Sequence, residues 1–512
     1  MARVKYTSSE RWTLLVTILA SSLVFIDGSA LNIALPALQH DLGLSGPQLL
    51  WVVNAYSLFL SALLLIGGAM GDRYGRNRIF GLGLFLFMIA SLFCGISTNA
   101  TQLITARVFQ GIGGALLIPG SLSILSAQFP ANKTGGAIGL WSMFSALTAI
   151  IGPLLGGWLA EIGLWRYIFF INIPFSVFVL WAIYYRVAES KNTEANKLDF
   201  VGAFFATLGL AGITYGFIES ANIGFGDIII VFSLSIGGLS SIAFIFSQHF
   251  GKQPMMPLKL FTITDFSITN IATLFIYGAL GAIMFFLPLN LVQVQGYSEV
   301  QTGLSLLPVM ILIVLLSSVS GRISDKTGPR LFLSIGPLIT GFAFFLFANQ
   351  GLTSGPEAFW NTFFLPLVLL GTGMGLTVAP LTTTVMLSVS KNNSGIASGV
   401  NNTVSRMSGV LSIALLGAMV LYFFKQYLFG QLHDLNMPMD VIEALNKEAI
   451  NLASTAAPAN TPADMLEKIE FLVKTSFIRS FNRVALISAM ATWLSALLCF
   501  AFIKNRKSSS SG

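Results

Sequence analysis

The chain alternates between long apolar stretches and short polar connections along nearly its whole length. Fourteen stretches reach roughly twenty residues, the length that an α-helix needs to cross the hydrocarbon core of a bilayer. They cover residues 12–35, 49–70, 79–96, 103–127, 135–159, 167–185, 200–218, 228–246, 266–292, 304–319, 331–347, 359–388, 396–424 and 484–503. This pattern predicts an all-α polytopic membrane protein with 14 transmembrane helices.

Composition excludes several other classes of protein. The 512 residues are 54% hydrophobic and 10% charged, and the mean hydropathy is +0.79, which is far from a soluble globular domain. The net charge of +7 comes without a basic run interleaved with aromatic residues, so no nucleic-acid partner is expected. The cysteines and histidines lack metal-ligand spacing. We therefore expect no metal, no cofactor and no catalytic residues, hence no enzyme.

The cations indicate how the chain is oriented. With the N-terminus inside, Lys and Arg gather in the tails and in the even-numbered loops, for example Arg73, Arg76, Lys133 and Arg186, whereas Arg166 is the exception among the outside loops. The positive-inside rule then places both termini in the cytoplasm. The first apolar run is too long for a signal peptide and is read as a retained helix. The expected location is the bacterial cytoplasmic (inner) membrane.

A charged loop between the second and third apolar runs returns in the second half of the chain. The first copy is Gly68-Ala-Met-Gly-Asp72-Arg73-Tyr-Gly75-Arg76-Asn-Arg78, and the second is Gly321-Arg-Ile-Ser-Asp325-Lys-Thr-Gly328-Pro-Arg330. A repeated loop in register between apolar runs is typical of an internally duplicated membrane protein. A pair of ordinary cytoplasmic loops is the alternative.

The first copy resembles the loop signature G-x-x-x-D-R-x-G-R-R of the major facilitator superfamily, from which Asn77 departs. The resemblance implies the major facilitator fold, with two six-helix bundles and two extra central helices. The expected parts are residues 12–186, a linker with two helices at 187–265, and residues 266–503, which include a long extracytoplasmic loop at 425–483. A conformational gate is expected at Gly68, Asp72, Arg73, Gly75, Arg76, Asp325 and Gly328.

One acid, Asp27, lies deep in the first apolar run, where an ionisable group is costly and by default functional. A structural salt bridge is the alternative. The run from Asp27 through Asn32 to Pro36 resembles the helix 1 signature of the fourteen-span drug:proton antiporter branch, and Arg107 with Gln110 resembles that branch's R-x-x-Q-G motif. Helical rise places Asp27 and Arg107 at similar depth. Pairing with Arg107 would favour the charged carboxylate and separation would favour its protonation, so the two residues are expected to couple protons to cargo.

The fifth apolar run carries a glycine-rich pattern with one proline. Its residues Gly139, Gly152, Pro153, Gly156 and Gly157 resemble the antiporter signature of exporters, with Thr148 in place of one glycine. Small residues allow close helix packing, and proline loosens the backbone ladder. The run from Trp165 to Pro174 resembles another pattern of the same branch. These resemblances imply export rather than uptake.

Several intramembrane polar residues are candidates for contact with cargo, although amides in membrane helices also serve to join helices. They are Asn32, Asn54, Gln110, Asn290, Gln293, Asn401, Asn402 and Arg406. Arg406 lies near the predicted midplane, where a cation needs a partner or a watery cavity. One acid, one midplane cation and many Phe residues would suit neutral or anionic amphiphiles better than dications.

The sequence therefore predicts a proton-coupled exporter of amphiphilic small molecules that works by alternating access and serves in multidrug efflux. A dedicated exporter of a lipid, a fatty acid or a siderophore-like metabolite is an alternative, and a non-transporting membrane receptor or scaffold is a third. The expected partners are the amphiphilic substrate, the bilayer and protons. A periplasmic adaptor is expected only in a Gram-negative organism.

Overall fold

The structure is a computed structural model that describes residues 6–191, 198–390, 393–434, 437–458, 461 and 463–504. Within these residues, 14 helices are long and apolar enough to cross a membrane, and the same residues form no β-strand. Each of the 14 overlaps one of the predicted apolar stretches. The prediction of an all-α, multi-pass membrane protein is therefore confirmed.

The chain divides into two compact units. The first holds Met1–Ala34, Val52–Ala211 and Ile236–Pro257, and the second holds Leu35–Trp51, Gly212–Ser235 and Leu258–Gly512. Helices α1 (Ser8–Leu42), α2 (Gly46–Tyr74), α8 (Phe200–Ile223) and α9 (Ile228–Phe250) thus contribute residues to both units. The predicted three-part division, which assigns the two extra helices to a separate linker, stays a prediction.

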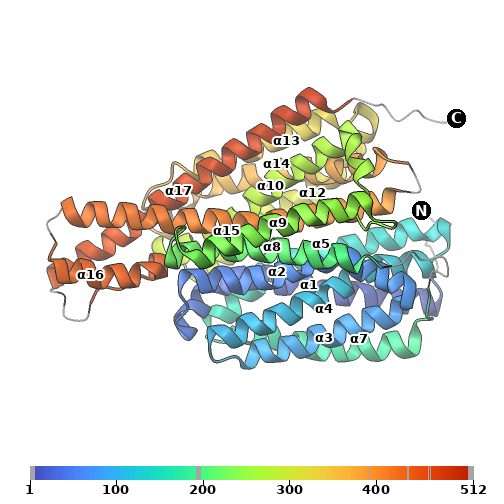
Figure 1. The fold of residues 1–512 in the computed structure, drawn as a ribbon, viewed down its shortest axis with the longest axis horizontal. Helices are drawn as coiled ribbons and strands as arrows, with labels where there is room; N and C mark the ends of the chain where they lie inside the picture. Colours follow the sequence, from blue (N-terminus) through green and yellow to red (C-terminus); the bar gives the residue numbers. More distant parts are fainter. Residues whose placement is uncertain are drawn as a thin grey trace. The chain divides into compact units, whose positions relative to one another are not determined.

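In the first unit, helix α3 is the centre of a close-packed layer. It contacts α4 and α7, beside which it lies in Figure 1. Phe80 and Phe87 of α3 and Leu117 of α4 are fully buried in the core of this layer. The remaining elements of the unit are α5 and the short α6, and the bounds are α3 (Arg76–Ile96), α4 (Ala100–Gln128), α5 (Ala131–Glu161), α6 (Tyr167–Phe170) and α7 (Asn172–Arg186).

The second unit is a bundle of helices, and its neighbouring helices are identified by their contacts. Helix α14 contacts α12, α13 and α15, whereas α17 contacts α10, α13 and α15. The bounds are η1 (Leu258–Thr262), α10 (Thr264–Leu289), η2 (Asn290–Val294), α11 (Glu299–Ser305), α12 (Leu307–Thr327), α13 (Arg330–Phe347), η3 (Pro356–Asn361), α14 (Phe364–Leu387), α15 (Ser394–Asp434), α16 (Met439–Glu448), η5 (Ala449–Ser454) and α17 (Ala463–Phe502). Of these, η2 is one turn of π-helix that prolongs α10.

The same kind of close glycine contact occurs within each of the two units. A Cβ atom added to Gly83 would lie 2.8 Å from the carbonyl oxygen of Gly113, and one added to Gly336 would lie 2.9 Å from that of Gly373. The charged loops repeat as well, because Gly75 and Gly328 both adopt a positive φ, of 116° and 92°. L-residues rarely adopt this conformation. The same close helix approach and the same turn at a positive-φ glycine in both halves agree with an internal duplication.

The segment predicted as a long loop at 425–483 is largely a continuation of two membrane helices. Helix α15 runs on to Asp434 and α17 already begins at Ala463, and Figure 1 shows these two helices side by side with α16 at their end. Leu428, Leu432, Phe477 and Phe481 of the continued turns are fully buried. Packing between α15 and α17 therefore extends both helices beyond the apolar runs that the sequence marks.

Candidate functional site

Asp27 of α1 and Arg107 of α4 form an ion pair inside the first unit. Arg107 Nη1 lies 2.6 Å from Asp27 Oδ2, and the side chains are 1% and 0% exposed. Arg107 Nε also donates to the carbonyl oxygen of Val52 at 3.1 Å, and its guanidinium lies 4.3 Å from the ring centre of Tyr56. The cation therefore has partners besides the carboxylate, which lowers the cost of holding it away from water.

Gln110 joins both members of the pair. Its Oε1 accepts from Arg107 Nη1 at 2.6 Å, and its Nε2 donates to Asp27 Oδ1 at 2.8 Å. Gln110 was a candidate for cargo contact in the sequence, but the structure places it in the Asp27–Arg107 cluster and leaves it fully buried. The three side chains form a closed ring of charge-assisted hydrogen bonds, which are stronger than neutral ones.

Two further polar residues extend this cluster, and neither was among the sequence candidates. Gln110 Nε2 donates to Ser91 Oγ of α3 at 2.9 Å, and Asn172 Nδ2 of α7 donates to the same oxygen at 3.2 Å. Asn172 lies within the run from Trp165 to Pro174 that resembles an antiporter pattern, and this was the signal that could have found it. Ser91 carries no such signal because a lone serine is common in a membrane helix.

Small residues of α5 bring that helix directly against α1 next to Asp27. A Cβ atom on Gly156 would lie 2.7 Å from the Cα of Ala30, and a Cβ atom on Gly152 would lie 3.0 Å from the Cβ of Ser29. At Gly139, by contrast, a Cβ would meet no atom within 4 Å. Among these three glycines of the signature, Gly152 and Gly156 therefore set the approach of α5 to the site.

Arg107 has partners in this cluster that do not depend on the charge of Asp27. While Asp27 is charged, Arg107 balances it in a region of low dielectric constant. When the carboxyl group is neutral, Arg107 still has Val52, Gln110 and the Tyr56 ring as partners. A change in the charge of Asp27 thus changes the strength of contacts that join α1 to α4.

The charged loop between α2 and α3 is held by its own ion pair and by the segment that follows α7. Asp72 Oδ1 accepts from Arg76 Nε at 2.8 Å. The Glu189 carboxylate accepts from the backbone N–H groups of Asn77 at 2.9 Å and Arg78 at 3.1 Å, at the start of α3. A negative charge there stabilises the helix N-terminus. Asn77 also donates to the carbonyl oxygens of Val187 and Ala188, both at 2.9 Å, so the residue that departs from the family signature joins two segments.

The other residues of the predicted gate lie at contacts between helices or at helix ends. A Cβ on Gly68 would lie 3.3 Å from Pro119 of α4, and the Arg73 guanidinium lies 5.7 Å from the ring centre of Tyr74. Asp325 and Gly328 lie at the end of α12, where Gly328 N donates to the carbonyl oxygen of Ser324 at 2.8 Å. Of the glycine-rich antiporter pattern, the remaining residues Pro153 and Gly157 lie within α5.

The candidates for cargo contact are scattered over several helices. Asn32 is half-buried on α1, and Asn54 is fully buried on α2 with no hydrogen-bond partner for its amide within the described residues. In the second unit, Gln295 Nε2 lies 3.4 Å from Asn290 Oδ1, and Gln293 Nε2 donates to Gln39 at 2.8 Å.

The candidates on α15 differ in exposure. Asn401 Nδ2 donates to Thr273 Oγ1 at 2.8 Å and lies 3.1 Å from Asn270 Oδ1, so it joins α15 to α10. Asn402 is exposed, and Arg406 is half-buried. In Asn401 the structure shows the helix-joining role that was the alternative for these amides. Cargo contact stays a prediction for the whole set.

Across the described ranges, no three His, Cys, Asp or Glu side chains gather as a metal site would require. Cys94 and Cys499 are buried free thiols. The acid of the Asp27 cluster is already paired with a cation, which would compete with any metal ion for the carboxylate.

Comparisons with known proteins agree on one family. The multidrug resistance protein Stp of Mycobacterium tuberculosis is 30% identical over 413 residues, which are 80% of this chain and 75% of Stp. The cephamycin export protein CmcT of Amycolatopsis lactamdurans is 31% identical over 419 residues, which are 81% of this chain and 86% of CmcT. The inward-facing structure of a bacterial homolog of the human lysosomal transporter Spinster matches with a TM-score of 0.65 and 18% identity, and the match covers 99% of this chain and 100% of that one. The sequence profile of the Major Facilitator Superfamily matches residues 17–413, and this chain belongs to that superfamily.

Proposed function

We propose that this protein exports amphiphilic small molecules across the bacterial cytoplasmic membrane in exchange for protons. The observation that carries the proposal is the fully buried Asp27–Arg107 pair with its 2.6 Å contact. A buried ion pair is a poor way to gain stability, because the desolvation of both charges offsets their attraction. An acid kept at that cost within a membrane helix is instead suited to proton transfer.

Coupling would follow from the two charge states of Asp27. A proton that arrives at Asp27 neutralises the carboxylate, and the contact to Arg107 loses its ionic part. Arg107 then relies on Val52, Gln110 and Tyr56, and α1 is less tightly held to α4. Release of the proton restores the pair. The two states of this contact would favour different conformations of the transporter, as exchange requires.

A route for protons is supported by buried polar atoms near the cluster. Asn172 Oδ1 is buried and has no hydrogen-bond partner within the described residues, although its Nδ2 binds Ser91. Buried polar atoms without a protein partner commonly bind ordered water. A water molecule bound to Asn172 would be connected to Asp27 through the hydrogen bonds of Ser91 and Gln110.

The direction of transport and the orientation rest on the sequence and the relatives. The glycine pattern of α5 resembles that of exporters, and the printed names of Stp and CmcT concern drug resistance and export. The cation distribution favours cytoplasmic termini. A C-terminal fusion to a reporter that is active only in the cytoplasm should be active, and an inactive cytoplasmic reporter together with an active periplasmic one would reverse the orientation.

Transport by the purified chain in liposomes tests the function. With an imposed pH gradient, the wild-type protein should move a fluorescent amphiphile against its concentration gradient while protons cross the membrane in the opposite direction. The Asp27→Asn variant should lose the effect of the pH gradient, whereas Glu443→Gln, which removes an exposed acid of α16, should keep it. Gradient-driven transport by Asp27→Asn at the wild-type rate would refute the proposal.

Relatives with different names show why the range of cargo needs its own experiment. Stp is named for resistance to many drugs, whereas the name of CmcT refers to one compound class. A panel of cationic, neutral and anionic amphiphiles in the same liposomes would distinguish the two. Transport of several unrelated amphiphiles indicates a multidrug pump, and transport of one class indicates a dedicated exporter.

A further inference from the structure

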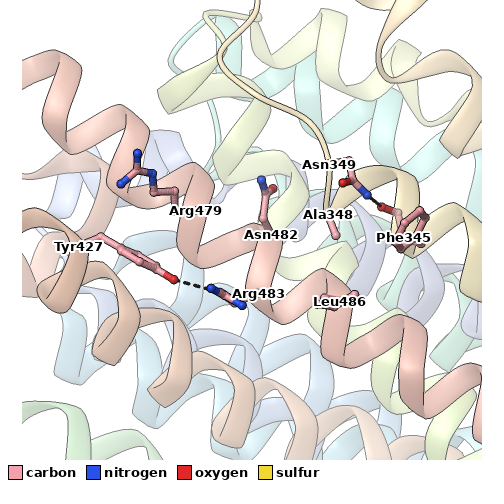
Figure 2. Close-up of a pocket in the computed structure, with 8 residues that line it drawn as sticks. All are labelled: Phe345, Ala348, Asn349, Tyr427, Arg479, Asn482, Arg483 and Leu486. Atoms are coloured by element: carbon pink, nitrogen blue, oxygen red, sulfur yellow. Dashed lines mark hydrogen bonds between the residues drawn. The ribbon is translucent and has the colours of Figure 1, made fainter.

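A cavity of about 470 Å³ lies in the second unit between α13, α15 and α17, far along the sequence from the Asp27 cluster. Figure 2 shows its lining, in which Arg479 and Arg483 of α17 and Tyr427 of α15 form one side. Both arginines are exposed, and they lie four residues apart, which places them on the same face of the helix. Two guanidinium groups therefore face one small cavity.

Tyr427 orients both arginines. Arg483 Nε donates to the Tyr427 hydroxyl oxygen at 3.0 Å, as the dashed line in Figure 2 shows, and the Arg479 guanidinium carbon lies 5.9 Å from the centre of the Tyr427 ring. The terminal guanidinium nitrogens of both arginines make no hydrogen bond to the part of the chain that the structure describes. Two arginines one helical turn apart that line the same cavity are suited to hold one anion.

No carboxylate neutralises this pair within the described part of the chain. Neither Arg479 nor Arg483 has an acid within salt-bridge distance there, and Glu470, which lies further toward the start of the same helix, is paired with Lys474 at 2.7 Å. Each amide group of the cavity already donates one hydrogen bond, from Asn349 Nδ2 to the Phe345 carbonyl oxygen and from Asn482 Nδ2 to that of Gln350, and neither amide carries a charge. The two guanidinium groups are thus the strongest donors that the cavity still offers.

The cavity changes from polar to apolar along the direction of the helices. Phe345, with 38% of its surface exposed, and Leu486 lie on the side that continues into the apolar run of α17. That run begins at residue 484, so the arginines lie at the border between its apolar part and the polar extension. In membrane proteins this border coincides with the level of the lipid headgroups.

We propose that this cavity binds the oxyanion head of an amphiphile, a phosphate or a carboxylate, on Arg479 and Arg483, with the apolar body along Phe345 and Leu486. Guanidinium groups bind such oxyanions through paired hydrogen bonds. With the orientation proposed above, the head would lie at the outer face of the membrane. The site does not use Asp27, so it is separate from the exchange of protons.

Binding to the full-length protein in a neutral detergent tests the site. Dihexanoyl phosphatidylglycerol, which is anionic, should bind wild-type protein about tenfold more tightly than dihexanoyl phosphatidylcholine, whose head has no net charge. The double variant Arg479→Gln/Arg483→Gln should bind the two lipids alike. Lys474→Gln removes one positive charge from the same helix outside the cavity and should keep the preference.

Displacement by inorganic phosphate identifies the source of the anion, and a single variant excludes misfolding as the cause of weaker binding. Inorganic phosphate that displaces the anionic lipid at millimolar concentration indicates a site for the charge alone, and failure to displace it indicates a lipid site. Arg479→Gln alone loses no hydrogen bond that the structure shows, so it should fold and still weaken the preference. Equal binding of both lipids to wild-type protein, or an equal loss in Lys474→Gln, would overturn the proposal.

Discussion

Replacing Asp27 with Asn would leave the guanidinium of Arg107 buried without its counter-charge. Removing one partner of a buried ion pair costs about 3–5 kcal/mol, because the other charge stays desolvated. Arg107 keeps its bonds to Val52 and Gln110 and its contact with Tyr56, so the lower end of the range applies. We expect Asp27→Asn to lower the free energy of unfolding by about 3 kcal/mol.

A double variant separates this stability effect from proton coupling. In Asp27→Asn/Arg107→Gln both charges are gone, so most of the lost stability should return. Transport driven by the pH gradient should stay absent in the double variant, because neither side chain can exchange a proton near neutral pH. In the double variant the free energy of unfolding should therefore recover, whereas transport driven by the pH gradient should not.

The measurements are denaturant unfolding in detergent micelles and gradient-driven transport in liposomes, for wild type, both single variants and the double variant. An unfolding free energy of Asp27→Asn within 0.5 kcal/mol of wild type, roughly the usual range for surface substitutions, would contradict the buried pair. Restored transport in the double variant would contradict the role of Asp27 in coupling. The two results are independent of each other.

Four further substitutions test the close approach of α5 to α1, the cap of α3 and the amide that joins α15 to α10. Gly156→Ala should impair folding, because its Cβ would overlap the backbone of α1, whereas Gly139→Ala should be tolerated, and thermal unfolding compares the two. Glu189→Gln should lower stability by about 0.5–2 kcal/mol through the weaker cap of α3, and an unchanged unfolding midpoint would argue against that cap. Asn401→Ala should cost about 1–3 kcal/mol, because it removes the donor to Asn270 Oδ1 and Thr273 Oγ1, and a cargo affinity that falls while stability holds would instead favour a binding role.

The sequence alone determined the membrane helices and the family. Hydrocarbon imposes a length of about twenty apolar residues on each span, so the spans can be counted without knowing what packs against them. The charged loops could be recognised because Gly75 and Gly328 recur at the same spacing, and their positive φ explains why glycine is needed there. Asp27 stood out because an acid within an apolar run is costly.

The sequence indicated the Asp27–Arg107 pair, whereas only the tertiary structure decided which other polar groups join it. Ser91, Gln110 and Asn172 come from three helices, and an apolar run does not show which of its faces is turned toward a neighbour, since lipid and helix core are both apolar. The extension of α15 and α17 was missed for a related reason. Its turns are too polar to be read as membrane spans, and they are helical because Leu432 and Phe481 are buried where the two helices pack together. Hydropathy detects burial in lipid, whereas burial between two helices of the same chain depends on contacts that exist only after folding.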